Sequence, residues 1–191
     1  MIAGIDYGAK LAGTPVVAWM QDGRIQFASC LKGKDADAFI FSWTLQHRPQ
    51  KVFIDAPLSL PGKYSGLAGC SDYFYRDADK QLQAMSPMFL GGLTARAMQL
   101  AARLREEGVD VVETYPAYLS RLLSLNELGY KKEKNAIGGV ARVLSAQFSF
   151  AIPDLPDWHH IDALLALLSG LRHACGGALS FGRVEEGVIV V

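Results

Sequence analysis

The sequence predicts an α/β domain built on one mixed β-sheet that is flanked by helices. Short apolar runs separated by turn signals fill the first third of the 191 residues, which is typical of strands joined by hairpins. Later apolar runs alternate with patterns of helical period, which is typical of parallel strands joined by crossovers. Hydrophobic residues make up 50% of the chain and charged residues 20%, as in ordinary globular domains. We therefore expect an antiparallel three-strand meander followed by parallel strands.

The meander is expected at the start of the chain. Its three strands cover residues 2–6, 13–20 and 24–31. Asp22-Gly23, between the second and third strands, is a strong hairpin signal because both residues tolerate the positive φ angles of tight turns. The three strands are therefore expected to pair in chain order.

Helices and two further strands follow. Helical patterns cover residues 36–47, 93–107, 117–125, 135–148 and 158–173, and short apolar strands cover 51–55 and 109–113. Asp35 and Asp157 are suited to cap the first and last of these helices, and Gly108 is suited to end the second. Because a helix precedes residues 51–55, we expect that strand to pair in parallel with the first. The tail, residues 178–191, is expected to form a hairpin.

One stretch, residues 61–92, has little regular pattern. It mixes glycines and serines with aromatic and charged side chains and emerges beside Asp55. Long loops in compact domains are commonly functional lids or disordered, and the aromatic content favours an ordered lid. We expect residues 1–191 to form a single domain, with residues 61–92 as an inserted loop over the site.

Charge and composition exclude several classes of protein. The 19 basic residues balance the 19 acidic ones, so a strongly basic nucleic-acid binder is not indicated. No apolar run approaches the ~20 residues that span a bilayer, and no signal peptide is evident, so a cytoplasmic protein is predicted. The three cysteines contain no CxxC pair, which argues against a zinc site or a disulfide framework.

Four acidic residues lie at positions that are expected to be buried, where an unpaired charge is costly. Asp6, Asp55 and Glu113 each end an apolar strand, and Asp162 lies inside an apolar helix. Carboxyl ends of strands meet at one edge of such a sheet, so these side chains are expected to converge. Carboxylates are the ligands that hard divalent cations prefer. We therefore predict a Mg²⁺ or Mn²⁺ site at Asp6, Asp55 and Asp162, with Glu113 as a fourth catalytic candidate or as a partner for Arg76.

Each acid also has a purely structural interpretation. Asp6 suits a turn that uses the amides of the next residues, and Asp55 suits a cap for the loop that follows it. Asp162 lies near a helix N-terminus, where the helix dipole favours a carboxylate. His159 shares a helix face with Asp162, and a metal ligand, a proton shuttle, an outer-shell partner and an ordinary histidine all remain open for it.

Basic residues supply the candidate substrate contacts. Arg76 and Asp79 are spaced i,i+3, which suits a surface salt bridge as well as recognition of a phosphate or carboxylate by the guanidinium. Lys10 follows the first strand closely enough to approach a phosphate. A basic run at Lys131, Lys132 and Lys134 is read as a solvated helix start or, as the lesser alternative, a phosphate contact.

Five motifs occur in an order that resembles a known family. They are Gly-Ile-Asp-Tyr-Gly at 4–8, Ile-Asp-Ala-Pro-Leu-Ser-Leu-Pro at 54–61, Arg-Asp-Ala-Asp-Lys at 76–80, Glu-Thr-Tyr-Pro at 113–116 and His-His-Ile-Asp-Ala at 159–163. Together they resemble an uncharacterised family of predicted nucleases with a ribonuclease-H-like fold. The motif at 54–61 is the most specific of the five.

The resemblance implies a meander, a mixed sheet and an acidic active site. In the wider ribonuclease-H-like superfamily, one acid lies on strand one, one near strand four and one on a late helix, and Asp6, Asp55 and Asp162 fall at these places. Holliday-junction resolvases look similar in carrying acids on strand four and the last helix. Where such an enzyme has a second acidic or histidine position one turn before the helix acid, this chain has His159, which leaves the number of metal ions open.

Three functions are compatible with these features. The favoured one is a metal-dependent nuclease or phosphodiester hydrolase that acts on nucleic acid or a nucleotide; the neutral net charge is its weak point. A non-catalytic binding module of the same fold is the alternative. A nucleotide-binding phosphotransferase of the actin-like class is the least favoured, because such proteins use two domains of this kind and 191 residues supply only one. The apolar tail, residues 188–191, would also suit a homodimer contact.

Overall fold

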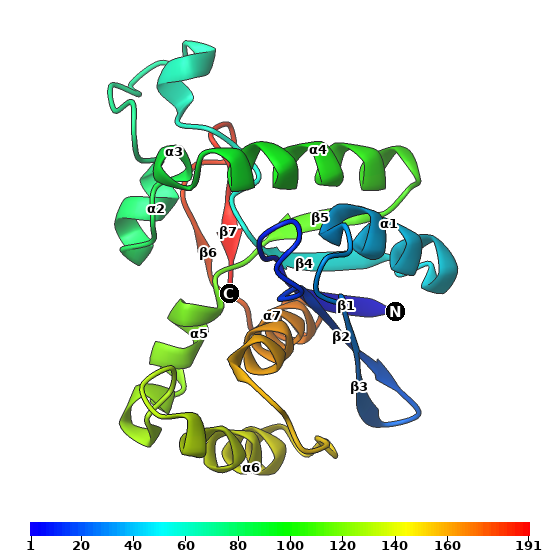
Figure 1. Ribbon diagram of the computed structural model, residues 1–191. Helices are drawn as coiled ribbons and strands as arrows, with labels where there is room; N and C mark the ends of the chain where they lie inside the picture. Colours follow the sequence, from blue (N-terminus) through cyan, green and yellow to red (C-terminus); the bar gives the residue numbers. More distant parts are fainter.

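The computed structural model describes residues 1–191 and is organised around one seven-stranded mixed sheet with the strand order β3-β2-β1-β4-β5-β7-β6. The strands are β1 (Ile2–Asp6), β2 (Val16–Gln21), β3 (Arg24–Ser29), β4 (Lys51–Asp55), β5 (Asp110–Glu113), β6 (Ser180–Phe181) and β7 (Ile189–Val190). Helices flank the sheet (Figure 1), so the predicted fold class is confirmed.

The strand directions follow the predicted pattern. β1, β2 and β3 pair antiparallel in chain order. β4 joins the other side of β1 in parallel, and β5 joins β4 in parallel. The sheet therefore has the antiparallel meander and the parallel strands that the sequence predicts.

The tail takes part in the same sheet. β6 and β7 form the predicted hairpin, and β7 also pairs in parallel with β5 through Glu113 and Ile189. Ile189 and Val191 are buried in the core that underlies the last helix. The tail residues expected at a homodimer contact therefore pack inside the chain's own fold, because the sheet extends beyond its fifth strand.

The helices include the five that the sequence patterns predict, together with α2 and α3, which the patterns do not predict. They are α1 (Ala36–His47), α2 (Asp77–Leu82), α3 (Pro87–Leu90), α4 (Gly92–Glu106), α5 (Pro116–Leu122), α6 (Ile137–Phe148) and α7 (Trp158–Ala174), with 3₁₀ turns η1 (Gly62–Ser65), η2 (Leu125–Leu128) and η3 (Lys134–Ala136). Asp35 and Asp157 cap α1 and α7 by accepting hydrogen bonds from backbone amides of the first turn. None of these helices is long and apolar enough to cross a membrane.

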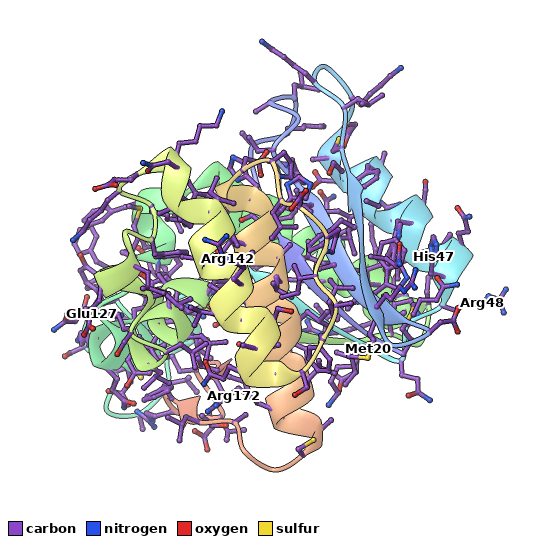
Figure 2. All side chains as sticks on the ribbon, turned by 90° about the horizontal axis from the view of Figure 1, so that it is seen from below. Met20, His47, Arg48, Glu127, Arg142 and Arg172 are labelled. Atoms are coloured by element: carbon purple, nitrogen blue, oxygen red, sulfur yellow. The ribbon has the colours of Figure 1, made fainter.

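Two layers of helices cover the two faces of the sheet. α1 and α4 lie on one face, over a core that includes Ile5 and Ile54, and α7 lies on the other (Figure 1). Seen from the α7 side, α6 and α7 lie next to each other in front of the sheet (Figure 2). Residues 161–170 of α7 are all buried. A helix buried on every side must be apolar all round, which makes the carboxylate of Asp162 an exception that calls for a function.

Two glycines bring α7 unusually close to the sheet. A Cβ atom on Gly4 of β1 would overlap the backbone of α7 at Ala163 and Leu167. A Cβ atom on Gly170 would overlap side chains of β1 and β4, including Phe53. Since successive strand residues alternate between faces, Asp6 points to the same α7 side as Gly4. The close approach at Gly4 therefore places the start of α7 beside Asp6.

The segment between β4 and α4 is ordered. Where the sequence shows little pattern, the structure has η1, α2 and α3, which lie together beyond the end of β4 (Figure 1). The segment is held by polar side chains that reach it from distant parts of the chain, as described below. Local periodicity could not reveal these contacts, because they involve partners far away in sequence.

Replacing Gly4 by alanine is expected to lower the free energy of unfolding by about 1–3 kcal/mol or more, because the methyl group meets rigid helix backbone rather than a flexible side chain. Chemical denaturation measures this loss. Gly138→Ala in α6 is the matched control, since a Cβ atom there meets nothing within 4 Å. Equal stability of the two variants would contradict the close-packing argument.

Candidate metal centre at the strand ends

Two of the predicted acids are direct neighbours in the sheet. Asp6 and Asp55 end β1 and β4 and are paired with each other in the parallel register. Residues in register on adjacent strands point to the same face, so both carboxylates project toward α7. The strand pairing alone therefore brings two carboxylates together at the carboxyl edge of the sheet.

The third acid comes from α7. Asp162 lies at the beginning of this helix, next to the close contact between Ala163 and Gly4. One carboxylate oxygen from each of Asp6, Asp55 and Asp162 lies within 4.8 Å of the others. Asp6 and Asp162 are buried, and Asp55 is partly exposed. The structure thus brings together the three residues that the sequence predicts as metal ligands.

Two of the three carboxylates have partners. His159 Nδ1 lies 2.7 Å from Asp6 Oδ2. The Tyr130 hydroxyl donates to Asp162 Oδ1, and Lys131 Nζ lies 2.6 Å from Asp162 Oδ2. The carboxylate of Asp55 has no such partner: the chain's groups act on it through burial and through the charges of neighbouring residues. Asp55 is partly exposed, and the repulsion between its carboxylate and the two neighbouring acids is what a bound cation would relieve.

The pKa values show how strongly these groups interact. Burial, with the nearby charges of Asp6 and Asp162, raises the pKa of Asp55 well above its ordinary value. Burial also raises the pKa of Asp162 to about 6, although the Lys131 ammonium opposes that shift. The hydrogen bond to Asp6 raises the pKa of His159. The site therefore concentrates negative charge that the chain balances only in part.

These residues fit a hard divalent cation. Three carboxylates with converging oxygens match the oxygen ligands that Mg²⁺ and Mn²⁺ take, and the unpartnered Asp55 is where a cation would relieve the most repulsion. Asp6, Asp55 and Asp162 are the residues that would hold the ion. His159 and Tyr130 contact ligand carboxylates and would orient them.

Glu113 does not join the cluster. It is in register with Ile54, one position before Asp55, and side chains alternate between faces along a strand. Glu113 therefore points to the opposite face from Asp55. There it binds the Arg76 guanidinium and accepts from the amide of Leu58. Of the two roles open to Glu113 from the sequence, the structure shows the partnership with Arg76.

Arg76 lies at the centre of a second, separate cluster. Its side chain is completely buried and donates five hydrogen bonds, the full set that a guanidinium can make. Both carboxylates that it contacts, Asp79 and Glu113, receive two each, and Ser59 receives the fifth. Arg76 and Asp79 do form a salt bridge, but in the interior rather than on the surface. Both side chains are buried and hydrogen-bonded to each other, whereas the sequence predicts that they contact a substrate.

Lys10 lies elsewhere and is exposed. Its ammonium is 3.2 Å from Asp35, the residue that caps α1. Glu186, in the tail hairpin, was not singled out by the sequence, yet its carboxylate accepts from the amides of Gly62 and Asp77. Glu186 and Arg76 thus fasten the segment between β4 and α4 from two sides. No local signal marks Glu186, because its partners are more than 100 positions away in sequence.

Tyr130 and Lys131 are the site residues that sequence reasoning did not place. Both approach Asp162 from the turn between η2 and η3. The sequence shows the basic run that contains Lys131, but the ion pair between Lys131 and Asp162 joins residues 31 positions apart and has no local signal. A cleft of about 370 Å³ opens beside the cluster; Asp55, Lys131, Tyr115 and Met85 are among the residues that line it. The segment between β4 and α4 therefore does contribute to the wall over the site.

Two solved structures resemble the chain. One is T. thermophilus RuvC in complex with a Holliday junction substrate, which is 16% identical, with 92% of this chain and 96% of that chain covered and a TM-score of 0.48. The other is the structure of Thermus thermophilus RuvC, with the same identity and coverage and a TM-score of 0.43. No protein-family model matches the chain, so membership of the family that its motifs resemble stays a prediction. No curated protein matches it either.

Asp55→Asn is expected to stabilise the protein when metal is chelated, by about 1–2 kcal/mol at pH 8. The folded pKa of Asp55 lies above the unfolded one, so ionisation of this carboxyl opposes folding as pH rises. The gain in Tm over wild type should therefore shrink as the pH is lowered from 8 to 5. If the variant is less stable than wild type at pH 8, the interpretation that ionised Asp55 destabilises the metal-free protein is wrong.

Arg76→Met is expected to cost about 3–5 kcal/mol of stability, because it leaves two buried carboxylates without their cation. Lys10→Met removes a cation from an exposed pair and should change Tm little. Thermal unfolding without substrate compares the two. Similar Tm values would argue that the Arg76 cluster is not what holds the segment.

Proposed function

We propose that this protein is a metal-dependent phosphodiester hydrolase, with nucleic acid as the favoured substrate. The observation that carries the proposal is the convergence of Asp6, Asp55 and Asp162, with Asp55 unpartnered, at the carboxyl edge of a ribonuclease-H-like sheet. Mg²⁺ or Mn²⁺ held there would activate water for attack on phosphorus and stabilise the leaving oxygen.

The residues around the ligands prepare the site for this chemistry. His159 holds one oxygen of Asp6 and leaves the other free to bind. Tyr130, buried against Trp158, fixes the orientation of Asp162. Such contacts hold the ligand carboxylates in their binding orientation, so they need not reorient when the metal ion and the substrate bind. The apolar surroundings that raise the pKa of Asp55 also strengthen electrostatic interactions with an ion and a phosphate.

The substrate would enter from the cleft beside Asp55. The cleft holds the cationic side chain of Lys131 together with apolar walls from Met85 and Leu90. The net charge of the chain is zero, so an overall basic charge does not contribute to affinity and the site itself must supply it. This favours a structured or short nucleic acid, or a nucleotide, over long duplexes bound through their backbone.

Calorimetric titration of Mn²⁺ and Mg²⁺ into wild type and Asp55→Asn is the first test. We expect the variant to lose at least about a hundredfold in metal affinity. Loss of an outer-shell partner typically lowers metal affinity by about 10–100-fold, and loss of a ligand lowers it further. Asp22→Asn, in an exposed hairpin turn, makes the same substitution away from the site and should bind as wild type does.

Cleavage of labelled DNA, RNA, branched DNA and nucleotides, with each ion, then tests the reaction. Wild type and Asp22→Asn should cleave at least one of them, and Asp55→Asn should not. Metal binding without any cleavage would favour the non-catalytic binding module. No metal binding by wild type, even with a nucleotide present to complete the site, would overturn the proposal.

A further inference from the structure

We infer that Lys131 is an internal counterion of the acid cluster, which a divalent ion displaces from Asp162 and which then faces a substrate phosphate in the cleft. This inference rests on the proposed function, because it assigns a role to a residue of the same site. It adds a site residue that neither the motifs nor the predicted ligand set contains.

The contact is built into the local structure. Tyr130 and Lys131 are consecutive, and each takes one oxygen of Asp162. Tyr130 is buried, with its ring edge-on to Trp158 at a centroid distance of 5.3 Å, so the turn is anchored next to the lysine. Lys131 has a φ of 57°, in the left-handed region that residues other than glycine seldom adopt. The lysine therefore extends from a turn whose position is fixed by the packing and hydrogen bond of Tyr130.

The lysine and a divalent ion compete for the same oxygens. The Lys131 ammonium is 2.6 Å from Asp162 Oδ2. A carboxylate oxygen of Asp162 lies within 4.8 Å of oxygens of Asp55 and Asp6. An ion held by all three carboxylates would lie within a few ångströms of that ammonium, where like charges repel strongly. Both cations cannot occupy the centre, so metal binding must move the lysine.

The displaced side chain has somewhere to go. Lys131 is 47% exposed and lines the cleft together with Asp55 and Tyr115. A flexible side chain at a cleft wall can turn outward without rearranging the buried Tyr130. An ammonium at that wall would meet the phosphate of a substrate bound over the metal, since lysine binds phosphate as a point charge. The same residue thus neutralises the empty cluster and contacts substrate in the loaded one.

The test is Mn²⁺ affinity by calorimetry for Lys131→Met beside Lys132→Met. We expect Lys131→Met to bind Mn²⁺ about tenfold more tightly than wild type, because the ion no longer has to break a close ion pair. Lys132→Met removes the same charge one residue further on, from an exposed side chain without an ion pair, and should change affinity much less.

The outcomes separate the two proposals. Measurable binding with equal affinity in wild type and Lys131→Met would overturn the counterion role and leave the metal centre intact. Weaker binding by Lys131→Met would also overturn it. Absence of binding in wild type and in both variants, even with a nucleotide present, would overturn the metal centre, and with it the proposed function.

A second measurement uses the wild-type chain and does not depend on how a variant folds. Reductive methylation read by mass spectrometry should label Lys131 slowly without metal, and Mn²⁺ should increase its labelling relative to Lys132 by releasing the ammonium from Asp162. The same Lys131-to-Lys132 ratio with and without bound Mn²⁺ would overturn the displacement.

Discussion

The site depends on the close packing of α7 against β1, which is possible only because residue 4 is glycine. Asp6 and Asp55 are placed by strand pairing, but Asp162 comes from a helix more than 100 residues later, and only direct backbone contact brings it near enough. A side chain at position 4 would hold the helix away from the sheet. The constraint that builds the core therefore also sets the spacing of the carboxylates, and stability and function are linked at this contact.

The chain treats its two buried clusters of charge differently. Around Arg76, each N–H of the guanidinium has an acceptor, which is how a buried ion becomes structural. Around Asp55 the charges are not fully balanced: three carboxylates face the Lys131 ammonium and the His159 imidazole, and the carboxylate of Asp55 accepts no hydrogen bond from the chain. Incomplete compensation of this kind is typical of functional sites, where a group kept ready for a ligand lowers the stability of the free protein.

Sequence reasoning recovered what local pattern determines. The capped helices, the meander and the ends of β1 and β4 follow from periodicity, turn signals and the cost of burying a carboxylate. The sequence alone does not reveal the features that depend on strand register or on contacts between segments far apart in the chain. Glu113 also ends a strand, yet a register offset of one residue turns it to the other face. Arg76 and Lys131 were seen as basic residues, but only the fold shows that one is buried among acids and the other reaches Asp162.

The central claim is that three carboxylates from β1, β4 and α7 act as one divalent-metal centre. Anomalous diffraction from a crystal grown with Mn²⁺ tests it most directly. The account predicts a peak within about 2–2.5 Å of carboxylate oxygens from Asp6, Asp55 and Asp162, with the Lys131 ammonium turned into the cleft. A fully ordered site with no such peak and Lys131 still paired to Asp162, while Mn²⁺ binds elsewhere, would contradict it.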